Sequence, residues 1–136
     1  MSLRISLLFL MASIQVACCS QALSYPVITD VSKIEVTKGS NTHVKEIVDG
    51  SQISKIVRFI DERRGRWCSP RCGSLPQASA TLNLYLENNG KGVIGFGNGF
   101  FVSEFSGGKY KMDISDAEEQ EFLQLLGISQ EDVFSK

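Results

Sequence analysis

The sequence predicts an α+β fold in which an antiparallel sheet, made of an N-terminal hairpin and a four-stranded meander, carries two helices packed on one face. Apolar and polar residues alternate along short segments between residues 34 and 114, and turn sequences such as "NNGKG" separate these segments. Two further segments, 49–64 and 115–127, have the apolar spacing of amphipathic helices. With 136 residues, the chain is expected to form one domain at most.

The first 19 residues have the pattern of an export signal, with cleavage expected near residues 17–22. A short positive start is followed by the apolar run "ISLLFLMASI" and then by small residues. This run is shorter than the roughly 20 residues of a membrane span. The sequence "VACC" partly matches a bacterial lipobox, so Cys18 or Cys19 is the candidate for lipidation. The alternative is a soluble secreted protein that loses both cysteines with its signal.

After a flexible tether, expected over residues 20–31, a single domain is predicted for residues 32–136. It opens with a hairpin, in which alternation around 34–36 and at 44–48 flanks a polar turn. Asp49 then stands at a helix N-cap position, with a glutamine three residues later as in a capping box. The predicted helix ends at Gly65. Its apolar stripe consists of Ile53, Ile56, Val57 and Ile60.

A loop is expected over about residues 65–79, after which the apolar period changes from 3.6 to 2. Four alternating segments separated by glycine-rich turns predict the meander, with one polar face. "SDAE", beginning at Ser115, is a capping box, and Gly127 is the expected end of the second helix. Its inward residues are expected to be Phe122, Leu125 and Leu126.

The stretch "RWCSPRCGSLP" contains Cys68 and Cys72 and follows a basic segment. A structural zinc site needs four Cys or His ligands, which this chain does not supply after loss of its signal, so no metal is expected. Redox catalysis is not expected either, because C-x-x-x-C followed by "GSLP" does not open a helix. We therefore expect a disulfide between the two cysteines, which a turn at Ser69-Pro70-Arg71 would bring together.

The sequence gives little support for nucleic-acid binding, for a nucleotide cofactor or for catalysis. The chain carries 14 basic and 15 acidic residues, so it has no overall attraction for nucleic acid. "GKGVIG" matches the dinucleotide fingerprint only literally, because strands are expected on both sides of it, and no cofactor is predicted. The acidic cluster 118–121 opens a helix, where negative charge is favoured without catalysis. An enzyme of the hydrolase type would have to use His43, the only histidine.

Arginines gather around the single tryptophan in the loop that follows the first helix. Because Trp and Arg are enriched at binding hot spots, this loop is a candidate partner-facing element. The alternative is that the tryptophan covers the core and the arginines pair with Asp61 and Glu62. The candidate residues are Arg63, Arg64, Arg66, Trp67 and Arg71.

The leader "LLFLMASIQVACCS", together with a small α+β domain, resembles small exported bacterial lipoproteins, some of which are immunity proteins or enzyme inhibitors. The resemblance implies a periplasmic or lipid-anchored location, with the lipid as the only link to the membrane. It also implies a protein partner, such as a toxin or an envelope enzyme. We therefore expect a non-catalytic binding protein. The alternatives are a small secreted hydrolase using His43 and a purely structural envelope lipoprotein.

Overall fold

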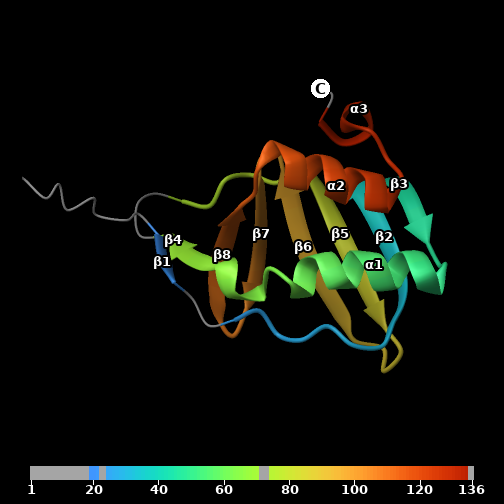
Figure 1. Cartoon of the computed structure of the whole chain (residues 1–136), viewed down its shortest axis with the longest axis horizontal. Coiled ribbons are helices and arrows are strands. Elements are labelled where there is room, and N and C mark those ends of the chain that lie inside the picture. Colours follow the sequence, from blue (N-terminus) through green and yellow to red (C-terminus); the bar gives the residue numbers. More distant parts are fainter. Residues whose placement is uncertain (1–18, 22–23, 71–73, 135–136) are drawn as a thin grey trace, which may run out of the picture.

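The computed structural model describes residues 19–21, 24–70 and 74–134 (Figure 1). It confirms the predicted α+β architecture, with one antiparallel sheet in the order β1-β4-β8-β7-β6-β5-β2-β3. The strands are β1 (Cys19–Gln21), β2 (Val31–Lys38), β3 (Thr42–Ile47), β4 (Cys68–Pro70), β5 (Ala80–Leu86), β6 (Lys91–Gly97), β7 (Phe100–Phe105) and β8 (Gly108–Asp113). The helices are α1 (Gly50–Asp61), α2 (Asp116–Leu126) and the short α3 (Gln130–Phe134).

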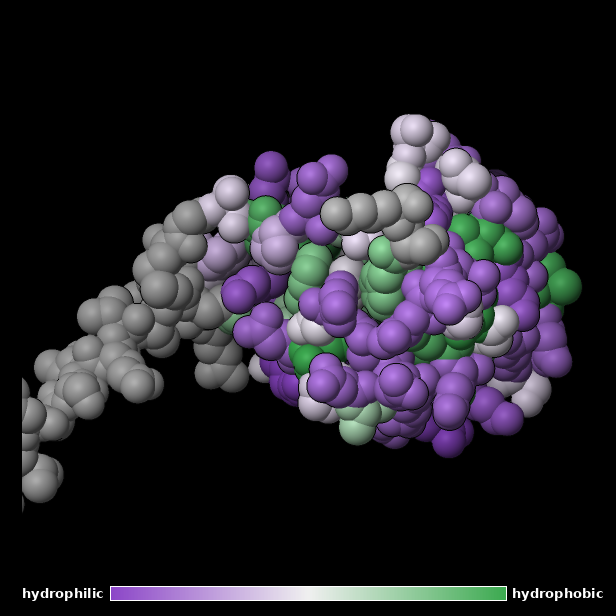
Figure 2. Space-filling view, turned by 90° about the horizontal axis from the view of Figure 1, so that it is seen from above, coloured by the Kyte–Doolittle hydropathy of each residue, from purple (hydrophilic) through white to green (hydrophobic). Residues whose placement is uncertain are grey.

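Helices α1 and α2 lie side by side on one face of the sheet, and the core fills the space between these layers (Figure 1). Phe122 of α2 is at its centre, with ring centroids 4.9 Å from Phe101 and 5.3 Å from both Phe59 and Phe96. Burial of these four rings supplies a large part of the hydrophobic stabilisation. The end of the molecule seen in Figure 2 is mostly hydrophilic, with hydrophobic residues in small separate patches.

Both predicted helix starts are confirmed. The carboxylate of Asp49 accepts hydrogen bonds from the backbone N–H groups of Ser51 and Gln52. The side chain of Gln52 does not complete a capping box; it donates to the Leu125 carbonyl at 3.0 Å and so joins α1 to α2. At α2 the capping box between Ser115 and Glu118 is complete.

The predicted end of the first helix at Gly65 is wrong. Helix α1 stops at Asp61, and Gly65 lies in a separate turn of 3₁₀ helix, Arg64–Arg66. The chain turns early because the Arg63 side chain bonds the Phe59 carbonyl and Glu118 of α2, while the next residues lead Trp67 into the core. Phe59, which the predicted stripe missed, is buried, and Val57 is only half-buried.

Two expectations for the irregular segments are also wrong. The segment predicted as a flexible tether is fixed between Tyr25 and Asp30, because the Tyr25 ring is 6% exposed and packs into the core. The segment Cys68–Pro70, predicted as loop and turn, is strand β4, which pairs with β1 and β8. Both segments are short and lack a hydrophobic period, so long-range contacts define their conformation: core packing for residues 25–30 and strand pairing for Cys68–Pro70.

The predicted signal and the candidate lipidation residue Cys18 lie outside the described residues, and for Cys19 only the backbone is described. Signal cleavage and lipidation therefore stay predictions. Within the part of the chain that the structure describes, none of the helices has the length and apolar character needed to span a bilayer.

Candidate functional site

A connecting segment, residues 25–30, runs beside α1 on the helix-bearing side of the sheet (Figure 1). We call it the strap. Its first residue is fixed by two bonds: the Tyr25 N–H donates to the Arg64 carbonyl at 3.0 Å, and Arg64 Nε donates to the Tyr25 carbonyl at 2.6 Å. Its last residue, Asp30, accepts from the Glu87 N–H at 2.8 Å. Residues 26–29 make no backbone hydrogen bond in the described part of the chain. The strap is thus held at its two ends.

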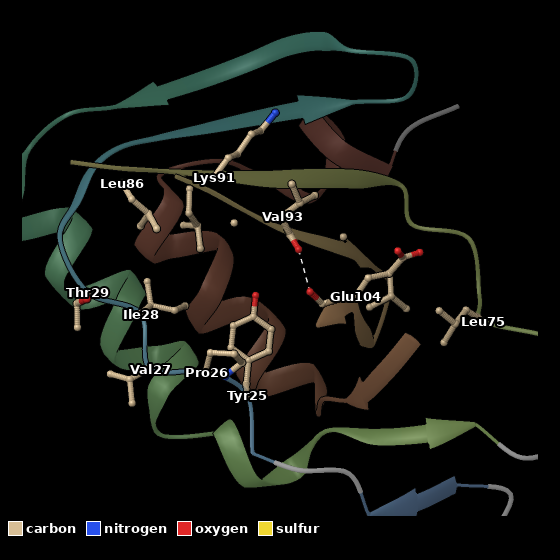
Figure 3. Close-up of a pocket in the computed structure, with 15 residues that line it drawn as sticks. Tyr25, Pro26, Val27, Ile28, Thr29, Leu75, Leu86, Lys91, Val93 and Glu104 are labelled. Carbon is tan, nitrogen blue, oxygen red and sulfur yellow. Dashed lines mark hydrogen bonds between the residues drawn. The ribbon is translucent and has the colours of Figure 1, made fainter. Parts of the chain in front are cut away.

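Tyr25 anchors the strap through its side chain as well as its backbone. Its ring stacks on Trp67, with centroids 5.2 Å apart, and meets Phe105 edge-on at 4.7 Å. Its hydroxyl points toward the sheet (Figure 3). Burial raises the pKa of Tyr25 above its ordinary value, and the Ser103 side chain opposes this only in part. The hydroxyl therefore stays protonated and acts as a hydrogen-bonding group.

The sheet opens opposite the strap. Strands β6 and β7 pair from Gly97 and Phe100 as far as Ile94 and Ser103, and the pairing then stops. Beyond this last pair, residues 91–93 of β6 pair only with β5, and residues 104–105 of β7 pair only with β8. We call these two diverging segments the fork. The Val93 carbonyl faces β7 but accepts from Ser103 Oγ at 2.9 Å (Figure 3). A side-chain hydroxyl thus occupies the place of a strand partner.

Between the strap and the fork lies a cavity of about 680 Å³. Small-molecule and peptide sites commonly have this size, a mainly apolar lining and a few polar groups. Tyr25 and Ser103 supply hydroxyl groups, and Lys91 and Glu104 supply charges at its margin. The apolar part of the lining includes Pro26, Val27, Ile28, Leu84, Leu86 and Val93.

Gly92 leaves the floor of this cavity open. A Cβ added there would meet nothing closer than Leu84 Cδ1 at 3.4 Å, which is an ordinary contact. Gly95, three residues further along the strand, is different, since its Cβ would lie 2.8 Å from Ala78 Cβ and 2.9 Å from Val102 Cγ2. Packing therefore requires glycine at 95 but not at 92. A strand glycine without a packing reason often marks the close approach of a ligand or of another backbone.

The cavity has an apolar rim. Val27 of the strap is 58% exposed and Val93 of the fork is 45% exposed. Among the described residues, the only other large hydrophobic side chain with such exposure is Val48. Both valines line the cavity, so apolar surface is exposed at its margin.

The structure decides between the two alternatives for the arginine and tryptophan loop. Trp67 is 1% exposed and covers the core beside Tyr25, so its ring is not presented to a partner. Arg63 lies over the Phe59 ring at 3.6 Å, and Arg64 holds the strap. Arg71 lies outside the described residues. The loop is therefore largely an internal clamp, whose arginines bond mainly to Glu118 rather than to Asp61. Of the two expected partners, Glu62 lies 3.8 Å from Arg63.

Glu118 is the centre of this clamp. It accepts from Arg63 Nε at 2.6 Å and from Arg66 Nη1 and Nη2 at 2.6 and 3.1 Å. The Arg66 hydrogen bonds, followed by those from Arg63 and the Ser115 backbone, hold the pKa of Glu118 far below its usual range, against the opposing effect of burial. The same contact raises the pKa of Arg66. The acidic start of α2 thus has a structural role.

The remaining candidates are not brought together. His43 is exposed on β3, and no hydrogen bond or ion pair joins it to a carboxylate among the described residues. Within the described ranges, no three His, Cys, Asp or Glu side chains are placed to hold a metal ion. Cys68 is not a free thiol, but Cys72 lies outside the described residues, so their pairing stays a prediction.

No protein-family model, no curated protein and no solved structure matches this chain. The candidate site therefore rests on its own geometry. Sequence reasoning missed it because its residues come from the strap and from three strands. One signal was present: "GKGVIG" contains Gly92 and Gly95, and its residues 91–95 lie within strand β6 rather than at a turn that opens a helix.

Proposed function

We propose that this chain is an exported, non-catalytic binding protein whose protein partner covers the cavity between the strap and the fork. The observation that carries the proposal is the combination of a cavity of about 680 Å³ with an exposed apolar rim. The leader sequence supports export, with a lipid on Cys18 or Cys19 as the proposed anchor. Binding of the inhibitor or immunity type is the form of this function that the resemblance of the leader and domain size favours.

The rim favours a protein partner over a small molecule. A small ligand inside the cavity would leave Val27 and Val93 in water, whereas a protein surface would cover both. Burial of a half-exposed valine contributes about 1 kcal/mol. The two rim valines together would therefore strengthen binding by roughly tenfold to a hundredfold beyond what the cavity itself contributes.

Affinity capture tests this proposal with matched variants. Immobilised wild-type protein, Gly92→Leu, Val27→Ser and Val48→Ser are exposed to envelope extract of the source cells. Val48→Ser is the control, because Val48 is as exposed as Val27 but does not line the cavity. We expect the same partner on wild type and Val48→Ser, and its loss on the other two variants. Equal capture by all four proteins contradicts the assignment of the cavity, and no capture by wild type contradicts the binding function.

Mass spectrometry of the protein from membrane and soluble fractions tests export and anchoring. We expect a mature N-terminus near residues 17–22, with or without an attached lipid. A chain that keeps its leader in the cytosol contradicts this part of the proposal.

A further inference from the structure

We infer that the partner's docking segment is an extended stretch with alternating apolar and polar residues, which adds as a strand to the edge of β6 that has no strand neighbour at the fork. This inference rests on the proposed function, since it specifies how the partner occupies the same cavity. It is argued from the backbone edge of the fork, from its two faces, and from the open floor at Gly92.

The backbone edge comes first. Residues 91–93 of β6 have a strand neighbour only on the β5 side. The Val93 carbonyl points to the other side, as its bond with Ser103 Oγ shows. Within a strand, the N–H and C=O of one residue point to the same edge, so the Val93 N–H also faces the fork. An extended peptide uses such an edge by strand addition, in which main-chain hydrogen bonds hold the peptide.

The two faces of the fork differ in chemistry. The helix-bearing side offers the cavity, with Leu84, Leu86 and Ile28 around it. On the other side, exposed Val93 shares a face with Lys91, which lies near the Tyr85 ring. Glu104 on that side lies 3.8 Å from Lys109. Successive side chains of an added strand point to opposite faces. Its residues would therefore alternate between an apolar environment and a mixed one that carries the charges of Lys91 and Glu104.

Gly92 makes room for the apolar residues. Its register partner Leu84 lies beside it on β5, and no side chain at 92 fills the space above. An apolar side chain of the added strand can enter there, between the sheet and Ile28 of the strap (Figure 3). A Cβ at 92 would make only an ordinary contact with Leu84, so a larger residue there would extend into this place.

A lipid is a less suitable occupant. An acyl chain makes no hydrogen bonds, so it leaves the strand edge unused. A peptide uses the edge, the cavity and both charges.

The first experiment selects peptides from a phage-displayed library of random nine-residue sequences on the wild-type protein. Selection on Gly92→Leu is the comparison. We expect enrichment of proline-free sequences with alternating apolar residues on wild type only. No enrichment, or the same sequences on Gly92→Leu, overturns the inference.

The second experiment tests the backbone bonds. The consensus peptide is synthesised unmodified and in two forms, each N-methylated on one alternate set of amides. Calorimetric titration is expected to show a loss of at least tenfold in affinity for one set, because those N–H groups face β6. Equal affinity of all three peptides overturns strand addition, as does tighter binding of palmitate that displaces the peptide.

These outcomes separate the two proposals. If partner capture depends on Gly92 but N-methylation has no effect, the proposed function stands and strand addition fails. If capture does not depend on Gly92, both fail. Concentration-dependent self-association that Gly92→Leu abolishes would assign the edge to a second copy of this chain and overturn the inference.

Discussion

Replacement of Glu118 by glutamine removes the charge at the centre of the arginine clamp while keeping the shape of the side chain. Glu118 and Arg63 are 19% and 14% exposed, and their contact is 2.6 Å long. Arg66 is 45% exposed, so solvent screens its contact more strongly. A hydrogen bond to a charged group contributes about 1.5–3 kcal/mol when it is shielded from water. We expect Glu118→Gln to lower the free energy of unfolding by about 2–3 kcal/mol, mostly through Arg63.

Urea denaturation followed by the fluorescence of buried Trp67 measures this loss. Arg66→Gln is the matched control, since it removes only the exposed half of the clamp and should cost about 0.5–1 kcal/mol. A loss below about 0.5 kcal/mol for Glu118→Gln would falsify the view that the clamp stabilises the fold.

The same variant has a pH dependence of known sign. Folding lowers the pKa of Glu118 from its ordinary value of 4.5, so the ionised carboxylate contributes stability above that value. This contribution is lost as the pH falls from 4.5 through the lower pKa of the folded state. The difference between wild type and Glu118→Gln should therefore shrink steadily below pH 4.5. A difference that stays constant from neutral pH into strong acid contradicts the assigned pKa shift.

Three further predictions concern the cavity and the helix starts. Gly95→Ala should lose about 1–3 kcal/mol of stability because its Cβ would overlap Ala78 and Val102, whereas Gly92→Ala should be neutral within about 0.5 kcal/mol; comparable urea midpoints for both would contradict the distinction. Tyr25→Ala should lower the free energy of unfolding by about 3 kcal/mol and make residues 25–30 the first site of limited proteolysis. If the strap of this variant resists the protease, Tyr25 does not anchor it. Asp49→Ala should lower the free energy of unfolding by about 1 kcal/mol, because the N-cap of α1 is lost. Asp49→Asn, which can still cap the helix, should stay close to wild type in thermal unfolding. Equal melting temperatures for all three proteins would contradict the capping role.

Local patterns predicted the regular elements well. The hairpin, the meander and both capped helices depend on alternation, on turn residues such as Asn-Gly and on the Asp49 and Ser115 caps, all of which act within a few residues. Errors occurred where distant contacts decide the conformation. Helix α1 ends before Gly65 because Arg63 reaches Glu118, 55 residues away. Strand β4 exists only through its pairing with β1 and β8.

The candidate site shows the same division. Trp67 and its arginines were the most conspicuous binding residues in the sequence, yet Trp67 packs against Tyr25, and Glu118 accepts from two of the arginines. The role of Gly92 follows only from its place opposite Leu84, beside the fork.

The sequence by itself determined the fold class, the order of the main elements and the expectation of export, because hydrophobic period, turn chemistry and helix capping are local properties of the chain. Only the tertiary structure decided that Tyr25 closes the core, that β6 and β7 part beyond Ser103, and that a cavity lies between them and the strap. These features depend on which distant segments meet, and no local pattern of residues encodes the volume that is left unfilled where they do.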